Sequence, residues 1–190
     1  MITVGIDEVG RGCWAGPLVA GAVILYAPII GLKDSKKLSK KQREVLAEQI
    51  HQQALAVGLG WIWPEDIDKN GISISVKNAM QMALEQIHIP YDEVIIDGNI
   101  NYLVEVPFTR ALIKADDLVP AASAASIVAK VARDTYMATI ATGEYPGYGF
   151  ERHVGYGTAE HIRSLEQYGV TPIHRQSYKP IQKFVLLSNS

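Results

Sequence analysis

Apolar and polar residues alternate one by one through residues 2–7. A repeat of two positions is typical of a β-strand with one face in the protein core. The neighbours Asp7 and Glu8 then point to opposite faces unless the strand twists or ends beside them, and Gly10 and Gly12 permit such a break. On this stretch alone, a surface turn with two solvated acids is the simpler interpretation, because charged residues are usually exposed where elements end. Further acids must converge here before the stretch indicates a functional site.

The apolar pattern predicts further strands and helices along the chain. Strands are predicted over residues 18–25, 55–63, 93–97 and 106–114. Helices are predicted to begin after a capping box of Ser39 and Gln42, near residue 74, at Pro120, and after Thr158 with Gly169 closing the last. Residues 64–71 are predicted to form a turn-rich loop. This order of elements predicts one α/β domain with at most a small C-terminal subregion.

Length and composition narrow the class of protein. A chain of 190 residues can bury about 70% of its unfolded surface without stapling. The single Cys13 forms no internal disulfide and fits a reducing compartment. The first residues lack the basic and apolar regions of a secretory signal, so a cytoplasmic location is expected. Residues 12–32 carry no charge, but Pro17 and Pro28 favour a buried strand over a membrane-spanning helix.

Charge is distributed unevenly along the chain. The net charge is −2 and the pI is about 6.2, which argues against a protein that grips nucleic acid by its overall charge. Basic residues nevertheless cluster within residues 33–43. That cluster is either a local phosphate-facing patch or a solvated helix start, and charge alone does not decide between them. Its members are Lys33, Lys36, Lys37, Lys40, Lys41 and Arg43.

Acids occur at the ends of two later elements. Asp97 ends a predicted strand, as Asp7 does, and Asp116 and Asp117 precede a helix of small residues over 121–130 that can lie close to a sheet. Sites in α/β sheets are built at strand ends, because the backbone is rigid up to the point where the side chain is presented. Each acid also has a simpler role when considered alone: Asp97 in a turn, and Asp116 or Asp117 as a helix cap.

Taken together, these stretches resemble the type 2 ribonuclease H family, specifically bacterial ribonuclease HII. The resemblance covers nearly the whole chain and rests on ordered motifs rather than on one match. The motifs are residues 5–12 (GIDEVGRG), 34–39 (DSKKLS), 95–99 (IIDGN), 124–131 (AASIVAKV), 155–158 (GYGT) and 171–175 (TPIHR). The resemblance implies a ribonuclease H-like catalytic domain over residues 1–190, with a mixed β-sheet flanked by helices and a small helical C-terminal subregion.

The resemblance also implies a metal site. In the family, four acids hold two divalent metals, and Asp7, Glu8 and Asp97 match three of them. Counting back from the serine of the small-residue helix assigns Asp116 as the fourth, with Asp117 as the second candidate. Oxygen ligands without nearby Cys or His suit Mn²⁺ or Mg²⁺ rather than zinc. Clustered carboxylates repel one another, so we expect lower stability without metal.

Substrate roles follow from the same resemblance. The segment Gly10, Arg11 and Gly12 resembles the backbone element that reads the ribose 2′-OH, and Tyr156 resembles the residue that stacks on the sugar of the following deoxynucleotide. An alternative for Tyr156 is a packed aromatic residue in a glycine-rich turn. The resemblance makes Lys36, with Ser35, a candidate for backbone phosphates. No role is assigned to His153 or His174.

The expected activity is therefore endonucleolytic. The chain is expected to hydrolyse the RNA strand of RNA-DNA hybrids and to incise at ribonucleotides embedded in duplex DNA, leaving 3′-hydroxyl and 5′-phosphate ends. A non-catalytic hybrid-binding module and a metal-dependent phosphatase of small molecules are the alternatives. A monomer is expected, and residues 182–187 only faintly suggest a sliding-clamp peptide, since a frayed or packed C-terminus is the simpler interpretation.

Overall fold

The computed structural model describes residues 1–32 and 35–188. Lys33 of the basic cluster and Asp34 of the second motif lie outside the described residues. The chain forms two compact units, each assembled from three separate segments. Unit 1 comprises Met1–Val9, Val19–Trp61 and Val76–Val131, and unit 2 comprises Gly10–Leu18, Ile62–Ser75 and Ala132–Ser190.

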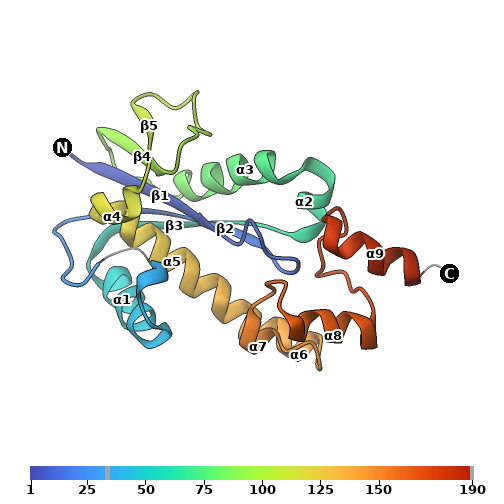
Figure 1. Cartoon of the computed structure of the whole chain (residues 1–190). Coiled ribbons are helices and arrows are strands. Elements are labelled where there is room, and N and C mark those ends of the chain that lie inside the picture. Colours follow the sequence, from blue (N-terminus) through green and yellow to red (C-terminus); the bar gives the residue numbers. More distant parts are fainter. Residues whose placement is uncertain (33–34, 189–190) are drawn as a thin grey trace. The chain divides into compact units, whose positions relative to one another are not determined.

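A mixed five-stranded sheet forms the centre of unit 1 (Figure 1). The strands lie in the order β3-β2-β1-β4-β5; β1 is antiparallel to β2 and parallel to β4, and β4 is parallel to β5. The predicted mixed sheet is thereby confirmed. The strands are β1 (Thr3–Val9), β2 (Leu18–Leu25), β3 (Ala54–Ile62), β4 (Glu93–Asp97) and β5 (Thr109–Leu112).

Helices occur in both units, and their caps follow the sequence signals. Ser39 and Gln42 make the predicted capping box, and the Thr158 side chain accepts from the His161 N–H at the start of α8. The helical elements are η1 (Ser35–Lys37), α1 (Lys40–Gln53), α2 (Pro64–Asn70), α3 (Ile72–Leu84), α4 (Ala115–Leu118), α5 (Pro120–Tyr136), η2 (Met137–Ala141), α6 (Thr142–Glu144), α7 (Phe150–His153), α8 (Ala159–Tyr168) and α9 (Lys179–Ser188).

Two predicted segments differ in the structure. The predicted loop over residues 64–71 is wrong, because it contains helix α2, with Pro64 in its first turn and Glu65 and Asp66 beside it. Those residue types stabilise a helix start. The strand predicted over residues 106–114 is also too long, since β5 covers only Thr109–Leu112.

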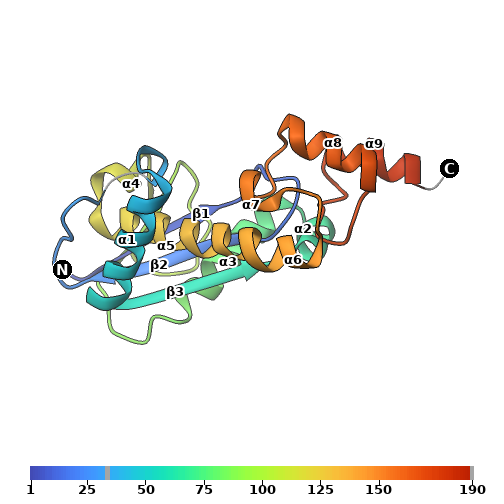
Figure 2. The same ribbon diagram turned by 90° about the horizontal axis from the view of Figure 1, so that it is seen from below.

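Helix α5 lies directly on one face of the sheet. A Cβ atom at Gly5 of β1 would overlap the backbone of Ala121, and one at Gly21 of β2 would lie 2.5 Å from the carbonyl oxygen of Ala125. Small residues on both elements therefore allow the close contact that the sequence predicted. Helix α1 covers the same face and α3 the opposite face (Figures 1 and 2). The face with α5 is the one toward which Asp7 points, two residues after Gly5.

Unit 2 has an apolar core of its own. Phe150, Leu165 and Ile181 are buried there with Met137 and Ala15, which comes from the N-terminal segment of the unit. Unit 2 contains the C-terminal part of the chain that was expected to form a subregion, together with Gly10–Leu18 and Ile62–Ser75. Among the helices of residues 1–32 and 35–188, none has the length and apolar character required to cross a membrane.

Candidate active site

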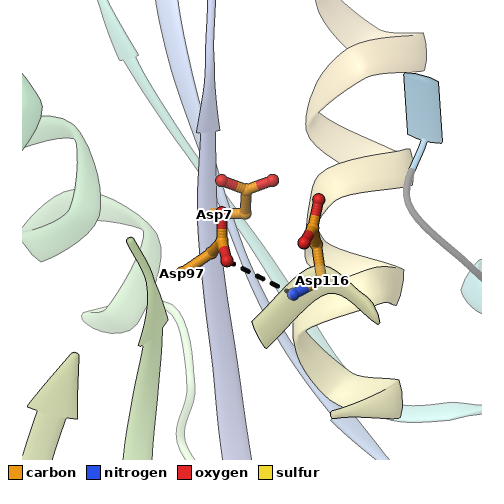
Figure 3. A group of neighbouring side chains, drawn as sticks. All are labelled: Asp7, Asp97 and Asp116. Carbon is orange, nitrogen blue, oxygen red and sulfur yellow. Dashed lines mark hydrogen bonds between the residues drawn. The ribbon is translucent and has the colours of Figure 1, made fainter. Parts of the chain in front are cut away.

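Three aspartates from separate elements of unit 1 converge. Asp7 lies in β1, Asp97 ends β4, and Asp116 lies in α4. One carboxylate oxygen from each lies within 4.8 Å of those of the other two (Figure 3). Asp7 and Asp116 are buried, with exposed fractions of 8% and 6%, while Asp97 is partly exposed. The backbone N–H of Asp116 donates to Oδ1 of Asp97 at 3.4 Å.

Strand register and one sharp turn explain the convergence. In the parallel pair β1 and β4, Ile6 lies opposite Ile96, so Asp7 and Asp97 follow side by side and point to the same face. Lys114, directly before α4, adopts the left-handed conformation with φ of 60°. That conformation is uncommon for a residue with a side chain. The turn carries Asp116 toward the two strand ends.

The environment of Asp7 disfavours its negative charge. Burial raises the pKa of Asp7 well above its ordinary value, and the charges of Glu8 and Asp97 raise it further. A hydrogen bond with the Ser126 side chain acts in the opposite direction. Hard carboxylate oxygens gathered in this way suit a hard divalent cation, which would relieve their repulsion. The residues present therefore fit a divalent metal site.

Glu8 is not among the three acids that converge. Strand β1 continues through Glu8 to Val9, which pairs with Val19 of β2, so the break that would turn Glu8 toward Asp7 comes later. Alternation along the strand places the two side chains on opposite faces. The backbone N–H of Glu8 does donate to Oδ1 of Asp7 at 2.8 Å. The role of Glu8 as a metal ligand stays a prediction.

Among the candidates for the fourth acid, the structure separates Asp116 from Asp117. Asp116 is in the cluster, whereas both oxygens of Asp117 lie 2.6 Å from Nζ of Lys37. Ser35 is buried, with its Oγ 3.0 Å from Oγ of Ser126. The predicted phosphate roles of Ser35 and its exposed neighbour Lys36 remain predictions.

The sequence did not predict Ser126 as a site residue, although it lies in the motif at residues 124–131. Its side chain contacts both Asp7 and Ser35, which links two stretches far apart along the chain. The available signal was its place in a helix of small residues, where a hydroxyl close to the sheet has little water to contact. We infer from these contacts that Ser126 orients the Asp7 carboxylate.

Two buried arginines support the segment that contains Gly10, Arg11 and Gly12. Arg175 donates from Nη1 to the carbonyl oxygen of Arg11 at 3.1 Å and from Nη2 to that of Gly16 at 2.9 Å. Arg133 donates from Nε to Pro17 O at 2.8 Å and from Nη2 to Ala15 O at 3.0 Å. Both guanidinium groups are fully buried. Their support of this segment was not predicted from the sequence.

Tyr156 belongs to the same unit and is tied to the same segment. The N–H of Trp14 donates to the carbonyl oxygen of Gly155 at 2.8 Å. A Cβ atom at Gly155, whose φ is +86°, would overlap the carbonyl oxygen of Ala15. Burial raises the pKa of Tyr156 to about 12, with Cys13 as the next contribution. The residue is still 40% exposed, so Tyr156 is partly open to solvent.

Solved structures with this arrangement of strands place the fold. A crystal structure of the ribonuclease H2 from Pyrococcus horikoshii OT3 superimposes with a TM-score of 0.83 at 26% identity, covering 100% of both chains. The structure of the PCNA:RNase HII complex from Archaeoglobus fulgidus superimposes with a TM-score of 0.81 at 26% identity, covering 94% of this chain and 96% of that one. The fold and the aspartate cluster define the class: a metal-dependent hydrolase of the ribonuclease H type.

Sequence comparisons define the family within that class. The model of the family Ribonuclease HII matches residues 4–181. The Ribonuclease HII of Dichelobacter nodosus (strain VCS1703A) is 48% identical over 189 residues, which cover 98% of this chain and 97% of that protein. The chain belongs to the ribonuclease HII family. It is a ribonuclease H endonuclease that acts on RNA-DNA hybrids.

Proposed function

We propose that the chain incises duplex DNA at single embedded ribonucleotides as well as the RNA strand of longer hybrids, leaving 3′-hydroxyl and 5′-phosphate ends. The observation that carries this proposal is the convergence of Asp7, Asp97 and Asp116, with oxygens within 4.8 Å of one another. Metal-assisted hydrolysis of a phosphodiester uses hard oxygen ligands gathered in this way to hold the cations. Membership of the family supports the choice of an RNA-containing duplex as substrate.

Two divalent ions, Mn²⁺ or Mg²⁺, are proposed as cofactors. Asp7, Asp97 and Asp116 would hold them, with Glu8 as the fourth ligand after a change at the end of β1. Bound ions of this class activate a water and neutralise charge on the attacking and leaving oxygens. The contribution of the chain is to hold three carboxylates together despite their repulsion, with Ser126 orienting Asp7.

Recognition of the ribose is assigned to unit 2. We propose that Gly10, Arg11 and Gly12 present main-chain groups to the 2′-OH, which distinguishes RNA from DNA. Tyr156 is proposed to stack on the sugar of the following deoxynucleotide, an assignment supported by the exposed part of its side chain. Ser35 and Lys36 are proposed to serve the phosphate backbone, with Lys36 exposed and Ser35 buried.

The broader organisation is also a proposal. Both units are proposed to serve one catalytic domain over residues 1–190 of a monomeric, cytoplasmic protein. The Archaeoglobus fulgidus relative was solved in a complex with PCNA. In this chain Phe184 is only 5% exposed and belongs to the core of unit 2, whereas Leu186 is 72% exposed. A clamp contact through residues 182–187 would therefore use Leu186 rather than the ring of Phe184.

A labelled DNA duplex with one ribonucleotide tests the proposed function. We expect incision at that position with Mn²⁺ or Mg²⁺ and none after chelation, with 3′-hydroxyl and 5′-phosphate products identified by mass spectrometry. Binding without incision would instead support a hybrid-binding module. Hydrolysis of a generic phosphate ester without duplex cutting would support a small-molecule phosphatase. An all-DNA duplex of the same sequence is the matched control.

A further inference from the structure

A chain of hydrogen bonds runs through two buried histidines to the backbone of Tyr156. His161 and His174 are 0% and 1% exposed. Their Nε2 atoms lie 3.0 Å apart, and Nδ1 of His161 lies 3.0 Å from the carbonyl oxygen of Tyr156. At its other end, Nδ1 of His174 lies 3.0 Å from the backbone nitrogen of Thr171. All of these groups belong to unit 2.

The backbone groups at the two ends of this series of hydrogen bonds decide which atom donates in each bond. The N–H of Thr171 can only donate, so in this 3.0 Å contact Nδ1 of His174 accepts and the ring proton lies on Nε2. The Thr171 hydroxyl, 2.8 Å from the same Nδ1, can donate to it as well, while the Thr171 carbonyl oxygen lies farther away at 3.3 Å. The carbonyl oxygen of Tyr156 can only accept, so Nδ1 of His161 donates and its Nε2 is the acceptor. The contact between the two Nε2 atoms then joins one donor to one acceptor. With these two opposite tautomers, the hydrogen bonds from Thr171 N–H to His174, from His174 to His161 and from His161 to Tyr156 O are all made.

Burial keeps both rings in the form that this pattern requires. Burial lowers the pKa of His161 to about 4. Burial, followed by the nearby His161, lowers the pKa of His174 to about 3. Near neutral pH each ring therefore carries one proton. A second proton on His161 would place two Nε2–H groups against each other, and a second proton on His174 would remove the acceptor of the Thr171 N–H.

A third histidine supports the residue before Tyr156. The N–H of Gly155 donates to Nδ1 of His153 at 3.2 Å, and Nε2 of His153 lies 2.8 Å from the carbonyl oxygen of Tyr148. The His153 ring stacks on His161, with ring centroids 4.6 Å apart and planes at 17°. The two residues that form the Gly155–Tyr156 turn are thus held by different imidazoles.

We propose that His153, His161 and His174 are positioning residues for substrate recognition. They hold the Gly155–Tyr156 backbone so that the exposed part of the Tyr156 ring is presented in one orientation to the deoxynucleotide sugar. This inference rests on the proposed stacking role of Tyr156. None of the three histidines contacts the substrate in this scheme. The proposal gives a function to His174, in the motif at residues 171–175, and to His153.

Two substitutions of His161 separate hydrogen bonding from packing. The amide nitrogen of Asn occupies the place of Nδ1, so His161→Asn keeps a donor for Tyr156 O, whereas the amide of Gln reaches the place of Nε2 and His161→Gln loses that donor. The measurement is kcat/KM on a duplex with one ribonucleotide, divided by kcat/KM on a continuous RNA-DNA hybrid. We expect this ratio to fall about tenfold in His161→Gln, mainly through KM, and less than about threefold in His161→Asn.

Equal loss in both variants would overturn the proposal, because it would mean that the ring serves only to fill space. Tyr156→Ala is measured alongside them, and an unchanged ratio in that variant would instead refute the proposed role of Tyr156. The ¹⁵N NMR spectrum of the wild-type imidazoles provides a test that needs no variant. We expect one proton on Nδ1 of His161 and one on Nε2 of His174. The same tautomer in both rings would contradict the proposed series of hydrogen bonds.

Discussion

Nζ of Lys37 lies 2.6 Å from both carboxylate oxygens of Asp117. This ion pair engages the second of two adjacent acids, while Asp116 faces Asp7 and Asp97. The two acids share one helix, α4, and differ by one position. Neighbouring residues of the same type therefore have different environments, and they provide a matched pair for experiment.

Asp116→Asn is expected to reduce incision of the ribonucleotide duplex by more than about a hundredfold. Substitution of residues that only support metal ligands already lowers metal affinity or activity by roughly tenfold to a hundredfold. Asp117→Asn is expected to keep most of the activity, because a partly exposed ion pair contributes only about 0–1 kcal/mol. Initial rates at saturating Mg²⁺ or Mn²⁺ provide the measurement. A greater loss in Asp117→Asn than in Asp116→Asn would reverse the assignment.

Asp7→Asn is expected to abolish activity and to raise the metal-free Tm. The folded-state pKa of Asp7 is raised, so the folded chain retains a proton at pH values where the unfolded chain has lost it. The destabilisation by this group therefore grows as pH rises above about 4 and is absent below that value. Each kcal/mol of destabilisation that the substitution removes corresponds to a Tm increase of about 2–4 °C.

The measurement for Asp7→Asn is thermal unfolding in chelator from pH 5 to pH 8. The gain over wild type should increase with pH, and added Mg²⁺ or Mn²⁺ should stabilise wild type more than the variant. Glu166→Gln, at an exposed position, controls for loss of one negative charge. A variant that melts below wild type at pH 8 without metal would contradict the explanation.

Gly10→Ala and Gly12→Ala are expected to separate folding from recognition. Gly10 has φ of +94°, and an added Cβ would lie 2.5 Å from Nε of the buried Arg133. We expect Gly10→Ala to lower stability by at least about 1–2 kcal/mol from the left-handed backbone alone. At Gly12 an added Cβ would meet nothing within 4 Å.

Gly12→Ala should therefore keep the wild-type Tm and lose activity only through its contact with the ribose. Thermal unfolding and the KM for the ribonucleotide duplex distinguish the two effects. An unchanged KM in a normally folded Gly12→Ala protein would count against the role proposed for the segment from Gly10 to Gly12.

Arg175→Lys is expected to lower the Tm and to raise the KM for the ribonucleotide duplex. The planar guanidinium reaches the carbonyl oxygens of Gly16 and Arg11 together, and an ammonium group lacks that fork. Each buried acceptor left unsatisfied costs about 1–3 kcal/mol. Arg163→Lys at an exposed position is the control. A KM unchanged by Arg175→Lys would show that this arginine has no role in substrate recognition.

Local sequence patterns predicted the elements that present the acids. Period-two alternation identified the strand that carries Asp7, and a short apolar run identified the strand that ends at Asp97. The parallel register of these two strands then brings both side chains to one face. The capping box at Ser39 and the cap at Thr158 were also readable, because each depends on residues within one helical turn. The choice of Asp116 over Asp117 came from motif spacing, and the structure places Asp116 in the cluster.

Features that depend on distant partners could not be predicted from local pattern. Strand β1 extends past Glu8, with Val9 paired to Val19, and Glu8 is not among the three acids that converge. Arg133 lies in the last turn of α5 and resembles, by sequence, an ordinary solvated cation. It is buried, and its guanidinium donates to the carbonyl oxygens of Ala15, Pro17 and Val154.

The three-segment composition of each unit limits how the protein can be divided. A fragment that ends at Val131 would retain every acid assigned to the metal site, yet Gly10–Leu18 and Ile62–Ser75 would lack the rest of unit 2. The complementary fragment from Ala132 onward would lack the glycine-flanked arginine. A single proteolytic cut or gene truncation therefore cannot separate unit 1 from unit 2, and exchanging either unit between relatives requires several coordinated splice points.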